Sequence, residues 1–147
     1  MKQIFKPQTE WLPPESFPDL SKYDEIAIDL ETKDPELKTM GSGSVTNRGH
    51  IVGIAVAVHD WVGYYPIRHE GGGNMDHGIV TRWFQSVLKT PATKIFHNAM
   101  YDVCFLRAER FEIHGTIVDT MIAGSLVDEN RFRYDLGSLG RDYVGIG

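Results

Sequence analysis

Apolar and polar residues first alternate strongly at residues 26–32, in the segment IAIDLET. Successive side chains of a strand point to opposite faces, so its branched residues fall on one face, which carries Ile26, Ile28 and Leu30. The other face carries Asp29 and Glu31, whose Cα atoms lie about 6.6 Å apart at the usual strand rise. Ionised carboxylates are costly to bury without a positive partner, so this strand predicts a cation at its acidic face.

The next part of the chain predicts a loop and then a hairpin. Residues 33–49 are polar, and the length of this stretch is typical of either a functional loop or a mobile one. The runs IVGIAVAV and VGYYPI, at 51–58 and 62–67, are rich in β-branched and aromatic residues. The short turn at His59 and Asp60 joins them, which favours an antiparallel hairpin.

Helical spacing replaces strand spacing after residue 74. Apolar residues recur every three or four positions over 79–88, with Asn74 as the expected N-cap and Pro91 shortly beyond the end. This pattern predicts a helix packed on a sheet.

Two further strands and two further helices are expected in the rest of the chain. Residues 93–97 predict a short strand that leads into a second helix, whose apolar stripe consists of Tyr101, Cys104, Phe105, Ala108 and Phe111. Residues 115–118 are compatible with another strand, and 120–127 predict a third helix that begins at Asp119. The order of strand, hairpin, helix, strand, helix, strand, helix indicates an α/β domain with a mixed sheet flanked by helices.

Composition narrows this prediction. With 147 residues the chain is one ordinary domain that buries roughly 70% of its unfolded surface. No apolar run approaches the length of a membrane span, so we expect no membrane association. Four prolines among the first eighteen residues favour an extended arm over residues 1–20, followed by the folded domain at 21–147. No closing helix or strand follows residue 139, so we expect the chain to be a fragment of a longer protein.

Charge and cysteine content exclude several kinds of site. The single cysteine, Cys104, is expected in the core and excludes an intrachain disulfide and a cysteine-based zinc site. The net charge of −5 argues against a general nucleic-acid-binding surface, because neutralising phosphates normally requires a basic face. Any role on nucleic acid is therefore local, assisted by metal, or shared with another domain.

A third carboxylate is expected to join the first two. Asp102, in FHNAMYDVCFL, lies one turn into a helix that directly follows a strand. In open α/β sheets, functional groups gather at strand ends and at the helix starts that follow them, so Asp102 is expected to meet Asp29 and Glu31. Three acidic side chains in one site repel one another unless divalent cations neutralise them. Oxygen ligands of this kind suit Mg²⁺ or Mn²⁺.

These motifs resemble those of a known family. The DLE of IDLET and the N-x-x-x-D of HNAMYD are similar to the first and second motifs of the DEDD 3′-to-5′ exonucleases, which have a ribonuclease H-like fold. The order IDLET, GHIVGIAVAV, YYPIRHEGGGN, FHNAMYD, VDTMIAGSLVDE and RYDLGSLGRDYVG is similar to the proofreading domain of DNA polymerase I-type enzymes, particularly phage ones. The resemblance covers nearly the whole chain after about residue 20.

The resemblance implies a function and a set of site residues. Two metal ions, Mg²⁺ or Mn²⁺, would hydrolyse 3′-terminal nucleotides of single-stranded DNA, as proofreading in the cytoplasm of a bacterial or phage-infected cell. Asp29 would contact both metals, Glu31 the one that carries the attacking water, and Asp102 the other. Thr32 and Asn98 would contact the terminal nucleotide, although a cap or turn role is equally compatible with both. A polymerase domain, fused or separate, would be the partner.

The third motif of the family is missing. The segment from His97 to Asp102 also fits H-x-A-x-x-D, the third motif of one branch, but it follows an apolar strand and precedes further α/β structure, which favours the second motif. The branch that this chain resembles has Y-x-x-x-D instead, and no tyrosine here has an aspartate four residues later. Four aspartates are the available substitutes, and helix capping or a solvated loop charge is the favoured reading of each: Asp119, Asp128, Asp135 and Asp142.

Two other functions remain compatible with this sequence. An RNA-trimming exonuclease of the same superfamily would share the first two motifs. A catalytically inactive module that binds nucleic acid or a polymerase gains weight from the missing third motif.

Overall fold

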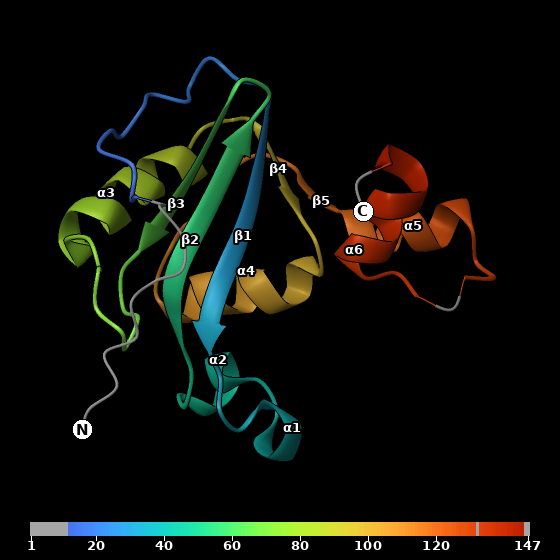
Figure 1. The fold of residues 1–147 in the computed structure, drawn as a ribbon, viewed down its shortest axis with the longest axis horizontal. Helices are drawn as coiled ribbons and strands as arrows, with labels where there is room; N and C mark the ends of the chain where they lie inside the picture. Colours follow the sequence, from blue (N-terminus) through green and yellow to red (C-terminus); the bar gives the residue numbers. More distant parts are fainter. Residues whose placement is uncertain (1–11, 132, 146–147) are drawn as a thin grey trace.

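A single mixed sheet organises the domain in the computed structural model, which describes residues 12–131 and 133–145 (Figure 1). Its strand order is β3-β2-β1-β4-β5. The central strand β1 pairs antiparallel with β2 and parallel with β4, and β4 pairs parallel with β5. The strands are β1 (Glu25–Lys33), β2 (His50–Val58), β3 (Trp61–Pro66), β4 (Thr93–Phe96) and β5 (Ile117–Asp119). The predicted α/β class and the hairpin with its turn at residues 59 and 60 are confirmed.

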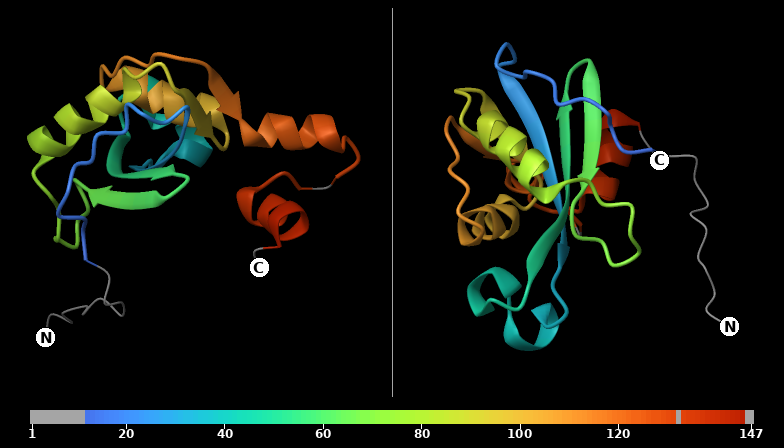
Figure 2. Two further views of the ribbon diagram at one scale, coloured as in Figure 1. Left: turned by 90° about the horizontal axis from the view of Figure 1, so that it is seen from above. Right: turned by 90° about the vertical axis from the view of Figure 1, so that its left-hand side faces the viewer.

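Two helices cover one face of this sheet. They are α3 (His77–Leu88) and α4 (Ala99–Ala108). Seen from above, the last helical segment runs outward from the β5 edge of the sheet, and its final turns lie on the side away from α3 and α4 (Figure 2). That segment comprises α5 (Thr120–Val127), α6 (Leu136–Leu139) and the π-helical turn η1 (Gly140–Val144). Two short helices, α1 (Leu37–Met40) and α2 (Gly43–Thr46), lie between β1 and β2.

The two faces of the sheet differ in composition because β1 alternates. Ile26, Ile28 and Leu30 are all buried against α3 and α4, as predicted. The opposite face is lined by small residues in register, where Ala27 of β1 pairs with Ala57 of β2. Val62 of β3, which pairs with Ala57, is 74% exposed. The sheet therefore has one face packed on helices and one open apolar face, which ends at the two acidic residues of β1.

Local predictions were wrong at three places. The side chain that caps α3 is Asp76, which accepts a hydrogen bond from the Ile79 N–H at 2.8 Å. Asn74 instead bonds to the backbone of His69, closing the loop before the helix. In α4 the buried stripe includes Leu106, whereas Ala108 is exposed. Cys104, expected in the core, is only partly buried.

The segment before β1 packs on the domain without forming a helix or strand. The Tyr65 hydroxyl donates to the Ser16 carbonyl at 2.8 Å, and the Trp83 indole N–H donates to the Pro18 carbonyl at 2.9 Å. Leu20 lies in the core. Residues 1–11 of the predicted arm lie outside the described residues, and the boundary at residue 20 stays a prediction. Among the described helices, none is long and apolar enough to cross a membrane.

Candidate active site

The free edge of β1 defines the candidate site. Pairing between β1 and β4 ends at Ala27, because β4 ends at Phe96. Further along β1, the backbone N–H of Leu30 donates to the Asp102 carboxylate of α4 across 3.4 Å. Asp102 thus takes the place that a longer β4 would occupy. Its carboxylate meets the backbone of β1 at the residue between Asp29 and Glu31.

The start of α4 is held in place by a carboxylate from the neighbouring strand. Asp119, at the end of β5, accepts hydrogen bonds from the N–H groups of Asn98 at 3.0 Å and Ala99 at 2.9 Å. It also accepts from the Met121 N–H at 2.9 Å, so it caps α5 as well. Satisfying the first N–H groups of a helix stabilises its start. Asp119 therefore fixes the turn of α4 from which Asp102 projects.

Burial and like charge act together on Asp102. Its side chain is 4% exposed, and desolvation together with the charge of Asp29 raises its pKa to about 7, with smaller contributions from Glu31 and Asp119. Burial also raises the pKa of Asp29, and the nearby His97 opposes this shift. The charges of Asp29 and Glu31 therefore act on the buried Asp102 carboxyl group. Asp102 thus lies near the carboxylates of β1, and their joint role as metal ligands stays a prediction.

The donor set fits a hard divalent cation. Asp29, Glu31 and Asp102 offer only carboxylate oxygens, which Mg²⁺ and Mn²⁺ prefer. A cation between them would relieve the repulsion that raises the pKa of Asp102. Across the described residues, no three His, Cys, Asp or Glu side chains are already grouped closely enough to hold an ion. Binding therefore requires Asp29 and Glu31, which are exposed, to turn toward Asp102.

The two predicted nucleotide contacts occupy different surroundings. The Thr32 hydroxyl shares a 2.9 Å hydrogen bond with the Tyr101 hydroxyl, which donates to Asp34 at 2.9 Å. The Thr32 side chain is therefore engaged within the protein. Asn98 is exposed and has left-handed backbone angles, φ 60° and ψ 59°. Its side chain makes no capping hydrogen bond. Its amide thus faces solvent at the start of α4, close to Asp102 in sequence.

The four possible substitutes for the missing carboxylate have local roles. Asp119 and Asp135 are N-caps of α5 and α6, as favoured from the sequence. Asp142 pairs with Arg131 at 2.5 Å, and Asp128 accepts from the Asn130 N–H at 3.1 Å. Of these aspartates, Asp119 alone contributes to the electrostatic environment of Asp102.

Sequence reasoning missed two side chains beside the carboxylates. His97 shares a 3.0 Å hydrogen bond between its Nδ1 and the Thr120 hydroxyl, and its charge lowers the pKa of Asp29. Tyr64 of β3 is close enough to Glu31 and Asp29 that both carboxylates raise its pKa, after the larger effect of burial. The register of the hairpin against β1 is the signal that places Tyr64 there, and it is a tertiary feature.

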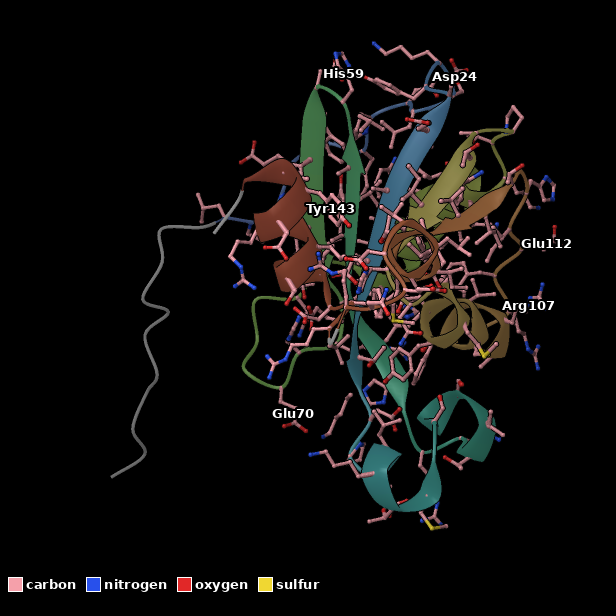
Figure 3. All side chains as sticks on the ribbon, turned by 90° about the vertical axis from the view of Figure 1, so that its right-hand side faces the viewer. Asp24, His59, Glu70, Arg107, Glu112 and Tyr143 are labelled. Atoms are coloured by element: carbon pink, nitrogen blue, oxygen red, sulfur yellow. The ribbon has the colours of Figure 1, made fainter. Side chains whose placement is uncertain are left out.

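A groove on the open face of the sheet leads to this site. It has a volume of about 300 Å³ and is lined by Asp29, His97, Thr120 and apolar residues of four strands, with Leu136 of α6 at its side. A larger hollow of about 500 Å³ lies near Asp24 and His59. These two residues are at the end of the sheet opposite to Glu70 (Figure 3). The larger hollow contains none of the candidate residues, so we assign the site to the smaller groove.

The mixed five-stranded sheet flanked by helices is a ribonuclease H-like fold. Three solved structures share this fold, at identities that show the fold alone. NrnC of Brucella melitensis with bound Mg²⁺ has a TM-score of 0.63 and 22% identity, over 88% of this chain and 57% of its own. Pol1 of M. smegmatis has a TM-score of 0.62 and 16% identity, over 86% of this chain and 20% of its own. Escherichia coli RNase D, an exoribonuclease, has a TM-score of 0.61 and 16% identity, over 86% of this chain and 29% of its own.

The sequence comparisons identify the family. The model of the 3′-5′ exonuclease family matches residues 5–147, so the chain belongs to this family and the predicted resemblance is confirmed. A DNA-directed DNA polymerase of Pseudomonas phage M6 is 31% identical over an alignment of 138 residues that covers 89% of this chain. DNA polymerase DpoZ of Acinetobacter phage SH-Ab 15497 is 28% identical over 130 residues, or 88% of the chain. The chain spans about a fifth of the length of these relatives, 21% and 19%.

Proposed function

We propose that Asp29, Glu31 and Asp102 bind two Mg²⁺ or Mn²⁺ ions and remove nucleotides one at a time from a single-stranded DNA 3′ end. The observation that carries this proposal is the Asp102 carboxylate on the Leu30 N–H, between the two acids of β1. Membership of the 3′-5′ exonuclease family supports the direction of cleavage. The all-oxygen donor set supports the choice of ions.

Each residue has a distinct task in this proposal. When bound, the ions lower the pKa of a coordinated water and stabilise the departing 3′ oxygen. Asp29 and Glu31 hold them from the open face of the sheet, and Asp102 holds them from the side of α4. Asn98, whose amide is exposed at the start of α4, binds the terminal nucleotide. Thr32 contributes through its backbone, because its hydroxyl is bonded to Tyr101.

The biological setting that we propose is proofreading by a phage-type DNA polymerase. Both curated relatives are DNA polymerases of phages, and each is about five times as long as the matched region. A basic surface for the rest of the DNA would then come from the polymerase, which agrees with the net charge of −5 on this chain.

A nuclease assay with matched variants tests the site. A 5′-labelled single-stranded DNA is incubated with the chain and Mg²⁺ or Mn²⁺, and the products are resolved on a gel. We expect a ladder that shortens from the 3′ end, and we expect Asp29→Ala and Asp102→Asn to abolish it. Glu25→Gln is the control, because Glu25 is an exposed acid on the same face of β1 at its other end. Cleavage that persists in Asp29→Ala would contradict the proposal.

The same assay separates the two alternatives. Matched RNA distinguishes an RNA-trimming enzyme, which would degrade RNA faster than DNA. A non-catalytic module is favoured by one observation, the lack of any tyrosine followed by an aspartate four residues later. Such a module would bind labelled DNA in fluorescence anisotropy with Ca²⁺ and would leave it intact with Mg²⁺ and Mn²⁺.

A further inference from the structure

Tyr64 lies on the same face of the sheet as the two acids of β1. Directly paired residues of neighbouring strands share a face, and Asp29 pairs with Ala55, which pairs with Tyr64. One row further along, Glu31 pairs with Gly53. Asp29, Ala55 and Tyr64 thus form one row across three strands, and Glu31 and Gly53 form the next.

The ring of Tyr64 leans from its own row across Gly53. A Cβ atom added to Gly53 would lie 2.5 Å from Cζ and 2.8 Å from Cε2 of this ring, and closer still to the hydroxyl oxygen. Only glycine has room for the ring here. The Tyr64 hydroxyl therefore stands over the residue paired with Glu31, which brings it beside that carboxylate.

His69 fixes the hydroxyl in this place. Its Nε2 shares a 2.5 Å hydrogen bond with the Tyr64 hydroxyl. The loop that carries His69 is itself closed by Asn74, which accepts from the His69 N–H at 2.7 Å and donates to the His69 carbonyl at 2.8 Å. The side chains of Tyr64 and His69 are both half-buried. The imidazole of His69, held by its closed loop, and the space over Gly53 thus together place the Tyr64 hydroxyl beside Glu31.

The tautomer of His69 decides which way the proton of the Tyr64 hydroxyl points. When the Nε2–H of His69 donates to the phenolic oxygen, the hydroxyl proton is directed away from the imidazole. A protonated phenol beside a carboxylate is a hydrogen-bond donor to it.

We propose that Tyr64, held by His69 over Gly53, is a positioning residue that orients the Glu31 carboxylate for binding a divalent metal ion. The proposal rests on the proposed function, because it assigns Glu31 to the metal. Ligating carboxylates are commonly hydrogen-bonded by a second protein group, and removing such a partner typically lowers metal affinity 10- to 100-fold. Tyr64 acts through Glu31 and does not itself contact the ion.

Mn²⁺ binding measured by electron paramagnetic resonance, without nucleic acid, tests this directly. We expect Tyr64→Phe to weaken Mn²⁺ binding about 10-fold, because only the hydroxyl is lost. Gly53→Ala should have a similar effect, because the new methyl group displaces the ring while every carboxylate stays. The control is Tyr23→Phe, which removes a hydroxyl bonded to Asp60 at 2.5 Å at the other end of the sheet.

A double variant separates positioning from a general structural effect. If Gly53→Ala acts by displacing the hydroxyl, it should add little to Tyr64→Phe, whereas independent losses would multiply. Unfolding of each variant in EDTA reports fold stability separately from metal affinity. Unchanged Mn²⁺ affinity in Tyr64→Phe, with affinity lost in Glu31→Gln, would overturn the positioning role and leave the proposed function intact. Wild-type protein that binds no Mn²⁺ would overturn both.

Discussion

In the metal-free protein, the burial of Asp102 conflicts with the negative charge that its carboxylate carries when ionised. Asp102 is 4% exposed and lies near other acids, so its carboxyl group favours the protonated form, with a pKa of about 7. In the unfolded chain the same group has its ordinary pKa of 3.8. Between these values the folded state binds more protons than the unfolded state, so the free energy of unfolding falls as the pH rises from about 4 to about 7. Above that range the charged carboxylate remains a cost, which a bound cation would offset.

This conflict predicts that Asp102→Asn stabilises the metal-free domain. Asparagine is neutral at every pH and its oxygen still accepts from the Leu30 N–H. In EDTA at pH 8 we expect the variant to be more stable than the wild type by about 2 kcal/mol, with little difference at pH 4. Urea unfolding at pH 4, 6 and 8 measures the free energy of unfolding of both proteins. A difference between them that stays the same at all three pH values would contradict the prediction. The variant should also lose Mn²⁺ binding.

At the scale of elements, the site depends on where strands stop. β4 ends early, which frees the edge of β1 for Asp102, and β5 ends in Asp119, which holds the start of α4. The carboxylate of Asp119 serves backbone N–H groups of two helices, so its loss leaves several donors without an acceptor. The position of Asp102 is thus set by a side chain from a different strand.

We therefore predict that Asp119→Ala affects both stability and metal binding. The free energy of unfolding should fall by about 2 kcal/mol, the upper part of the range for lost caps. Mn²⁺ affinity should fall about 10-fold, because the turn that carries Asp102 loosens. Asp135→Ala is the matched control, since Asp135 caps α6 through the Ser138 N–H at 2.9 Å. It should lower stability less than Asp119→Ala does and leave Mn²⁺ affinity unchanged. Equal Mn²⁺ affinities of Asp119→Ala and wild type would refute the positional role of Asp119.

At the scale of the whole molecule, a buried lysine joins the two short parallel strands to the rest of the fold. Lys94 of β4 is 0% exposed. Its ammonium group donates to the carbonyls of Thr90, Ala92 and His114, at 2.5, 2.9 and 2.8 Å. All three of its donors are satisfied without a carboxylate. Lys94 thus ties the connection between α3 and β4 to the segment that leads into β5.

Replacing Lys94 should destabilise the molecule without changing the candidate active site. Lys94→Met leaves three carbonyls without their donor, and we expect a loss of about 3 kcal/mol in urea unfolding at pH 7. Burial lowers the pKa of Lys94 below 10.5, so the unfolded state binds more protons just below that pH. The stability contributed by Lys94 therefore rises with pH in this window, and the deficit of the variant should be larger at pH 10. The exposed Lys89→Met is the control, expected within about 0.5 kcal/mol of wild type.

Periodicity within a segment determined the elements and one face of the site. The alternation in IAIDLET is enough to place Ile26 and Ile28 in the core and Asp29 on the opposite face, because the period of a strand is a local property. The order of the acidic motifs likewise sufficed for the family, which the family model confirms.

Only the tertiary structure decided which distant residues meet. Asp102 is 72 positions from Leu30, and Tyr64 comes near the acidic face of β1 only through the register of three strands. The cap of α3 shows the same limit: Asn74 and Asp76 are both good caps, and the contact of Asn74 with His69 leaves the role to Asp76. Strand order, register and the length of β4 arise from packing between segments far apart in the chain, and a local pattern does not contain them.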